Sequence, residues 1–185
     1  MSHVLAYVEP GAKGRAVSQN FIINNNKVEG SVLDYKAKIR EYIEQNNLQA
    51  EHFEFATSCH TVEEAAKAVN ASIDELVKNV CLLSEDCRLI VAIVKGGDRV
   101  STSRVGKILK IERPRLANAD EILRYTGYPA GGVPSFGYPA IFLVDPKVTE
   151  LAYVYTGGGT PNSLVKIGTA ELLRANQGQV VRVRK

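Results

Sequence analysis

The sequence predicts one domain of mixed α/β class. Its 185 residues are enough for one domain with a sizeable core, whereas two domains of half that length would each have a small core. Stretches with helical periodicity and short apolar runs follow one another irregularly, whereas a doubly wound parallel sheet would need a helix of about 10–15 residues between successive strands. The hydrophobic fraction of 45% and the charged fraction of 23% are ordinary for a globular protein.

Residues 1–33 differ from the rest of the chain. They are rich in asparagine around NFIINNNKVEGS and carry few helix signals, so we expect an N-terminal extension that is irregular or holds a short strand at Phe21–Ile23. The domain itself is expected to span residues 34–185. It opens on DYKAKIREYIEQNN, where apolar residues recur at helical spacing and predict a helix. FEFAT, at residues 53–57, predicts a short strand.

The middle of the chain carries two helix-cap signals and a hairpin signal. Thr61 and Glu64 have the spacing of a capping box and predict a helix over VEEAAKAVN. Ser72 and Glu75 repeat that spacing before IDELVK, which predicts a second short helix. NVCLLSE and RLIVAIVK, separated by a short polar break, predict a β-hairpin. VSTS predicts another strand, and SRVGKILK predicts a helix.

The last third is divided by a loop of unusual composition. Asn118 and Glu121 predict the start of a helix that ends near Tyr125. GYPAGGVPSFGYP follows at residues 127–139 and holds four glycines and three of the seven prolines. AIFLVD and LAYVYT predict strands joined by PKVTE, TAELLRAN predicts a last helix, and VVRV predicts a final strand.

The composition also bounds the setting of the protein. No stretch of about 18 apolar residues is present, so we expect no membrane span, and the first residues lack the basic start and apolar core of a secretory signal. The three cysteines, Cys59, Cys81 and Cys87, are too few for a disulfide framework. We therefore expect a protein of the reducing cytoplasm.

A short basic run is the main feature of the charge distribution. The net charge of +3 permits a polyanionic partner without demanding one. Five cations lie from Arg104 to Arg115, with only Glu112 opposing them. The run is either a solvated face or a patch that contacts phosphates, and in the second case Arg104, Lys107 and Lys110 are the candidate contacts.

Metal and thiol chemistry find little support in the sequence. Cys59 and His60 are adjacent, but a zinc site needs about four ligands and no second pair at ligand spacing is present, so we expect no metal or other cofactor. A histidine next to a cysteine in sequence rarely has the geometry to activate its thiol. Cys81 lies in an apolar run that is typical of a core.

The glycine-rich segments allow two interpretations. GGVPSFG and TGGGTPN lack the spacings of nucleotide-binding loops. Because glycine lets the backbone approach a ligand and proline holds φ fixed, the segments are either two tight turns or the walls of a pocket that uses main-chain groups. Lys78, at the end of IDELVK, either caps a helix or projects its ammonium into that pocket.

These pieces occur in a recognisable order: TVEEAA, a lysine before an apolar hairpin, RLIVAIVKGGDRV, TGYPAGGVPSFG, AIFLVD and YTGGG. Over roughly residues 34–184 the chain resembles the YbaK family, the free-standing relatives of the editing domain of bacterial prolyl-tRNA synthetases. The resemblance implies a single α/β domain around a mixed, largely antiparallel, barrel-like sheet. It implies mischarged tRNA as the partner and ester hydrolysis as the reaction, most commonly on alanyl- or cysteinyl-tRNA(Pro). A monomer and a homodimer both remain open.

The resemblance also implies roles for particular residues. Lys78 matches the family's pocket lysine and would bind the terminal phosphate or the substrate carbonyl, while the ribose 2′-hydroxyl of the terminal adenosine positions or activates the attacking water. The family's substrate loop matches Gly131–Ser135, and its second glycine segment matches Thr156–Gly159. The candidate substrate-binding residues are therefore Gly131, Gly132, Val133, Pro134, Ser135, Asp145, Thr156, Gly157 and Gly158.

A stiff loop suits such a reaction for a physical reason. A missing methylene changes binding by only about 1–3 kcal/mol, so a separate hydrolytic site that admits only small amino acids is useful. Glycine and proline together can supply a rigid wall, and the main-chain N–H groups can stabilise the developing oxyanion.

The sequence departs from the family pattern at three places. Ser135 stands at the position of the loop proline, with Pro134 one place earlier, and Asn79 follows the lysine where many members have threonine. TPNSLV, after the second glycine segment, lacks the carboxylate of some members. Two alternatives therefore stay open: a non-catalytic tRNA- or RNA-binding module of the same fold, and a small-molecule hydrolase or protein-interaction domain.

Overall fold

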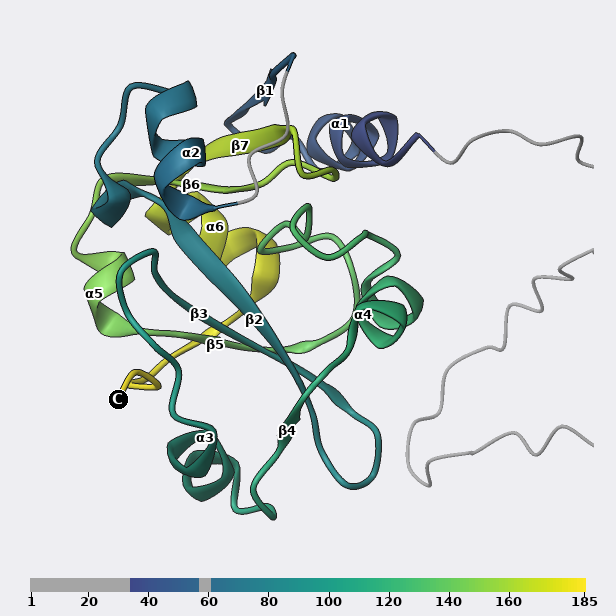
Figure 1. Cartoon of the computed structure of the whole chain (residues 1–185), viewed down its shortest axis with the longest axis vertical. Coiled ribbons are helices and arrows are strands. Elements are labelled where there is room, and N and C mark those ends of the chain that lie inside the picture. The colour runs from purple at the N-terminus through teal and green to yellow at the C-terminus, as the bar shows by residue number, and fades with distance from the viewer. Residues whose placement is uncertain (1–33, 57–60) are drawn as a thin grey trace, which may run out of the picture. The chain divides into compact units, whose positions relative to one another are not determined.

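The computed structural model describes residues 34–56 and 61–185, whose strands form two sheets (Figure 1). The first sheet is antiparallel and has the order β1-β7-β6, with β1 at Ala50–Glu54, β6 at Tyr153–Gly157 and β7 at Ser163–Gly168. The second has the order β4-β2-β3-β5-β8, with β2 at Val77–Leu83, β3 at Leu89–Lys95, β4 at Arg115–Leu116, β5 at Ile141–Val144 and β8 at Gln179–Val180. Within it, β4, β2 and β3 are antiparallel, whereas β3, β5 and β8 are parallel.

The prediction of a single mixed α/β domain with largely antiparallel pairing is confirmed for the described residues. The barrel-like arrangement is limited to one junction. Leu76, just before β2, forms an isolated parallel bridge with Tyr155 of β6 and so connects the two sheets without closing them into a barrel.

The helices begin where side chains satisfy their free N–H groups. Asp34 accepts hydrogen bonds from the amides of Lys36 and Ala37, and the predicted capping boxes at Thr61 and Asn118 are both present. The helical segments are α1 at Tyr35–Gln45, α2 at Val62–Ala68, the 3₁₀ turn η1 at Ile73–Glu75, α3 at Thr102–Leu109, α4 at Ala119–Thr126, α5 at Pro146–Thr149 and α6 at Thr169–Asn176.

Some predicted elements were wrong in type or position. IDELVK forms only the η1 turn before β2 begins at Val77, because the following residues pair with β3 instead of continuing a helix. VSTS is not a strand, since Ser101 caps α3. The linker PKVTE forms α5, and the first strand lies at Ala50–Glu54 instead of residues 53–57. The strand β7 was not predicted.

The five-stranded sheet is buried on both faces. Val91 and Ile93 of β3 pack into the core between the two sheets, which also receives α1 and α6. Ile90 and Val94, on the opposite face, pack against Val105 of α3. Figure 1 shows α3 on the far side of this sheet from α6. Burial on both faces explains why RLIVAIVK is a continuous apolar run instead of an alternating one.

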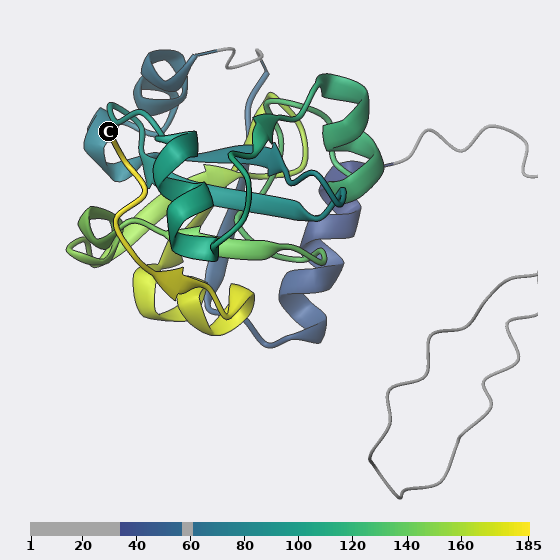
Figure 2. The same ribbon diagram turned by 90° about the horizontal axis from the view of Figure 1, so that it is seen from below.

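The C-terminal residues extend beside the start of α3 (Figure 2). Val100 and Arg184 form an antiparallel bridge, and the Ser101 amide donates to the Val183 carbonyl at 2.8 Å. The end of the chain is thereby part of the same structural unit as α3.

Some sequence-based expectations fall outside the described residues, among them the strand at Phe21–Ile23 and the Cys59-His60 pair. Within residues 34–56 and 61–185, the structure contains no cluster of three or more histidine, cysteine, aspartate or glutamate side chains arranged to hold a metal ion. A helix long and apolar enough to cross a membrane is also missing from this part of the chain.

Candidate functional site

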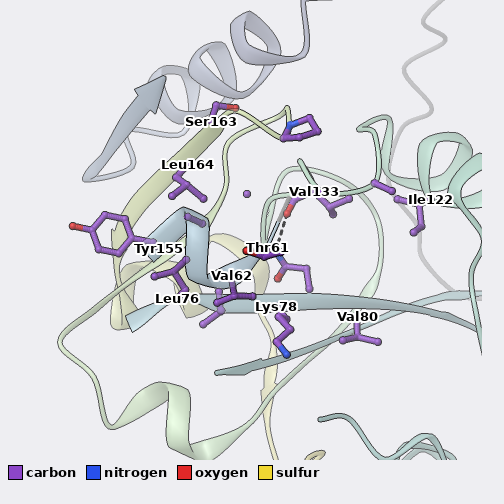
Figure 3. A pocket seen from close by; sticks show the side chains of 17 residues that line it. Thr61, Val62, Leu76, Lys78, Val80, Ile122, Val133, Tyr155, Ser163 and Leu164 are labelled. Carbon is purple, nitrogen blue, oxygen red and sulfur yellow. Dashed lines mark hydrogen bonds between the residues drawn. The ribbon is translucent and has the colours of Figure 1, made fainter. Parts of the chain in front are cut away.

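A cavity of about 330 Å³ lies beside the unpaired edge of β2 (Figure 3). The edge is open because β4 pairs only with Leu82 and Leu83, which leaves the first part of β2 without a described strand on that side. Five segments of the chain contribute the lining: Thr61, Val62 and Ala65 from the start of α2, Leu76 and the first residues of β2 as far as Val80, Ile122 from α4, Ala130, Gly131 and Val133 from the glycine/proline loop, and Tyr155, Gly157, Pro161, Ser163 and Leu164 from β6, β7 and their connection.

The two glycine-rich segments meet backbone to backbone at this cavity. A Cβ atom on Gly157 would lie 2.2 Å from the Val133 carbonyl oxygen, and one on Gly132 would lie 2.5 Å from the Thr160 nitrogen. The Gly159 amide donates to the Gly132 carbonyl at 2.8 Å. The glycines are therefore required for close approach of the two segments, and the same approach forms one wall of the cavity.

A buried hydrogen-bond network fixes the glycine/proline loop to β2 and β6. Asn79 Nδ2 donates to the Val133 carbonyl at 2.8 Å and to Thr156 Oγ1 at 2.9 Å. Ser135 Oγ donates to Asn79 Oδ1 at 2.6 Å and lies 2.7 Å from Thr156 Oγ1. Ser135 and Thr156 are fully buried, so their hydroxyls brace the wall and do not line the cavity.

The sequence interpretation named Ser135 and Thr156 as substrate-binding residues and gave Asn79 no role in the site. Asn79 is the centre of the network, because its amide group joins both hydroxyls and the Val133 carbonyl. A sequence signal was present, since Asn79 is the polar residue that precedes the apolar VCLL of β2.

The loop also offers unused main-chain donors. Gly131 and Val133 line the cavity, and neither amide has a hydrogen-bond partner within the part of the chain that the structure describes. Gly131 has a φ of 86°, which glycine adopts readily and other residues rarely do. Pro134 is buried beside them, and its carbonyl accepts a hydrogen bond from the Tyr138 hydroxyl at 2.7 Å.

Lys78 is the second residue of β2, and not the end of a helix as the sequence suggested. It lines the cavity, and no ion pair of its ammonium is present among the described residues. Because side chains alternate along a strand, Lys78 shares a face with Val80 and not with Asn79. In Figure 3, Lys78 and Val80 extend from the same side of β2, and the ammonium points away from Val133.

Asp145 lies outside the cavity lining and holds the end of the chain. Its buried carboxylate accepts hydrogen bonds from the amides of Lys147, Val183 and Arg184 and forms an ion pair with the Arg184 guanidinium. Burial alone would raise the pKa of Asp145, but these hydrogen bonds and the Arg184 charge outweigh it and lower the pKa. All of the polar contacts of this side chain are structural.

We expect Asp145→Asn to destabilise the protein at pH 7 by about 2 kcal/mol, because charge-assisted hydrogen bonds would be lost. A lowered folded-state pKa contributes stability above the unfolded-state pKa, about 3.9, and this contribution disappears as the pH falls through the folded value. Urea unfolding at pH 7 and pH 3 measures the gap between the two proteins. A gap that is as large at pH 3 as at pH 7 would contradict this assignment.

The basic residues of α3 and its C-cap lie apart from the cavity lining. Arg104 is half-buried, and Lys107 and Lys110 are exposed. Arg115, at the end of the basic run, is paired with Glu121 at 2.6 Å. The structure therefore places the predicted phosphate contacts on a neighbouring surface and not in the cavity.

The core cysteine, Cys81, lies in an environment that disfavours reactivity. Cys81 is buried in β2, and burial raises the pKa of its thiol to about 11. A protonated buried thiol is a poor nucleophile, in agreement with the core position predicted for Cys81.

Residues 56–175 match the family described as the aminoacyl-tRNA editing domain. The matched segment contains the whole cavity lining, from Thr61 to Leu164.

Individual proteins and a solved structure are also similar to this chain. An uncharacterized protein, YwhH, of Bacillus subtilis is 26% identical over 137 residues, which cover 72% of this chain and 86% of that protein. The proline–tRNA ligase of Lactobacillus gasseri is 27% identical over 132 residues, 65% of this chain but only 23% of the ligase. A crystal structure described as a proposed trans-editing enzyme for prolyl tRNA synthetase superposes with a TM-score of 0.77 at 25% identity, over 84% of this chain and 99% of that one.

Proposed function

Because the chain belongs to the family of aminoacyl-tRNA editing domains, we propose that it is a trans-editing hydrolase that removes the amino acid from mischarged tRNA. We assign this activity to residues 34–185. Small amino acids such as alanine or cysteine on tRNA(Pro) are the proposed substrates, and the similarity to part of a proline–tRNA ligase supports tRNA(Pro).

The observation that carries the proposal is the braced wall of the cavity. The Asn79, Ser135 and Thr156 network holds the Val133 carbonyl, and the glycine contacts leave no room for the loop to retreat toward β6. A wall that cannot move excludes side chains by size, which a flexible apolar pocket does poorly. The site thus suits a reaction that must spare the larger, correctly attached amino acid.

The proposed reaction is a direct attack by water on the ester carbonyl. The water oxygen bonds to the carbonyl carbon, the bond from that carbon to the ribose 3′-oxygen breaks, and a proton from the water passes to the ribose oxygen. The free amides of Gly131 and Val133 would stabilise the oxyanion, and the 2′-hydroxyl of the terminal adenosine would position the water. Lys78, which faces away from the loop, would hold the terminal phosphate.

A deacylation panel tests the proposal. Purified protein is mixed with Ala, Cys, Ser, Thr and Pro attached to tRNA(Pro) and to the amino acid's own tRNA, and the released amino acid is measured. Release of one small amino acid, with Pro-tRNA(Pro) spared, is the expected result. Binding of tRNA without release from any substrate would replace the proposal with the non-catalytic module.

A further inference from the structure

A second cavity, of about 360 Å³, lies between the start of α3, β4 and the C-terminal lysine. We call it the α3 groove. Its lining combines apolar residues, hydroxyls and two cationic side chains, and contains no aspartate or glutamate: Val80, Val100, Ser101, Thr102, Ser103, Arg113, Leu116 and Lys185.

The α3 groove adjoins the first cavity. Val80 lines both, and it lies on the same face of β2 as Lys78. A ligand that extends from the first cavity past Lys78 would therefore reach the groove without crossing the body of the sheet.

Hydrogen bonds fix the Arg113 side chain and the backbone of Lys185 beside the groove. Arg113 Nε donates a hydrogen bond to Thr102 Oγ1 at 2.6 Å, which keeps the guanidinium at the start of α3. The Lys185 amide donates to the Arg99 carbonyl at 2.8 Å, and the preceding Arg184 is anchored by Asp145. Neither Arg113 nor Lys185 forms an ion pair with a described carboxylate.

We propose that the α3 groove binds a nucleotide of the single-stranded 3′ end of tRNA, next to the terminal adenosine. This inference rests on the proposed function. Arg113, Lys185 and the hydroxyls would contact a phosphate, because cationic side chains and hydroxyl donors without a competing aspartate or glutamate suit a phosphate group. Leu116, 64% exposed, offers with Val80 an apolar surface for an unstacked base.

The surroundings of the groove give the strand a direction. Another cavity, beyond the turn that follows α3, is lined by Glu85, Asp86 and Glu112 and by the single cation Arg88. Its carboxylates would repel a phosphate backbone, so an RNA strand that occupies the basic groove would continue away from the acidic cavity.

The test uses the full chain and a fluorescently labelled RNA hairpin with a single-stranded ACCA 3′ end. Arg113→Ala and Lys185→Ala should each weaken binding by about tenfold or more, and each should reduce the slope of log affinity against log salt by about 0.7. Arg113→Lys should retain part of the affinity. Arg88→Ala, which removes an exposed cation from the acidic cavity, is the matched control and should bind like the parent protein.

Deacylation kinetics, measured on the aminoacyl-tRNA that the protein hydrolyses in the panel, separate this inference from the proposed function. The groove variants should raise KM and leave kcat unchanged, because the groove does not touch the ester. Parent-like binding by an Arg113→Ala/Lys185→Ala protein, in a chain that deacylates tRNA, would overturn the groove and leave the function standing. If the groove variants weaken RNA binding but the parent protein deacylates none of the substrates, the proposed function would be overturned and the groove would stand. Equal binding of a blunt hairpin, equally weakened by the variants, would overturn the single-strand assignment.

Discussion

Replacing Lys78 with alanine is expected to reduce deacylation by about 100-fold or more without unfolding the protein. The ammonium is the cationic group of the cavity lining and would orient the terminal nucleotide, so its loss would misplace the ester relative to the water and the loop amides. Stability should change by only about 0.5 kcal/mol, since Lys78 is half-buried and forms no ion pair with a described residue. Single-turnover deacylation and thermal unfolding of the same sample measure both effects.

Lys95→Ala is the matched control for this variant. Lys95 lies on β3 opposite Val77, in the same sheet and with the same charge, but outside the cavity lining. It should deacylate at the parent rate. Normal activity in a folded Lys78→Ala protein, or an equal loss in Lys95→Ala, would remove Lys78 from the proposed mechanism.

The second large effect is expected from Gly157→Ala. Its Cβ would lie 2.2 Å from the Val133 carbonyl oxygen, a separation that no packing tolerates, so the glycine/proline loop must shift. The shift would strain the hydrogen bond from Asn79 to Val133 and move the amides proposed to stabilise the oxyanion. We expect a loss of about 1–3 kcal/mol of stability, together with a fall in kcat of about 100-fold.

Gly97→Ala supplies the comparison for that variant. A Cβ on Gly97, in the turn after β3, would have no heavy atom within 4 Å, so this change should leave stability and activity close to those of the parent. Urea unfolding and deacylation of both variants separate the two sites. Parent-like kcat in Gly157→Ala would show that the position of the loop does not control the reaction.

Local sequence signals predicted most of the helices and the central hairpin. Each capping box, at Thr61 and at Asn118, is formed within four consecutive residues, so the residues that define these helix starts are close together in sequence. The pairing of β2 with β3 could also be predicted from the sequence, because two apolar runs separated by a short polar break are typical of a β-hairpin. The glycine/proline loop and Lys78 were also singled out from the sequence.

The tertiary structure decided where those residues lie and which partners they have. Lys78 became a strand residue because pairing with β3 outweighed a weak local helix signal, and this alternation turned its side chain away from the loop. Asp145 received its partners from Val183 and Arg184, 38 and 39 residues later.

The cavity wall and the α3 groove depend on the same kind of long-range contact. Asn79 is joined to Ser135 and Thr156, which lie 56 and 77 residues away, and the groove is completed by the last residue of the chain. The sequence by itself determined most of the helices, the central hairpin, the family resemblance and the chemical character of the loop. Only the tertiary structure decided which polar groups form hydrogen bonds that hold the cavity wall and which have no partner among the described residues. The reason is that hydrogen-bond partners distant in sequence cannot be predicted from a local pattern.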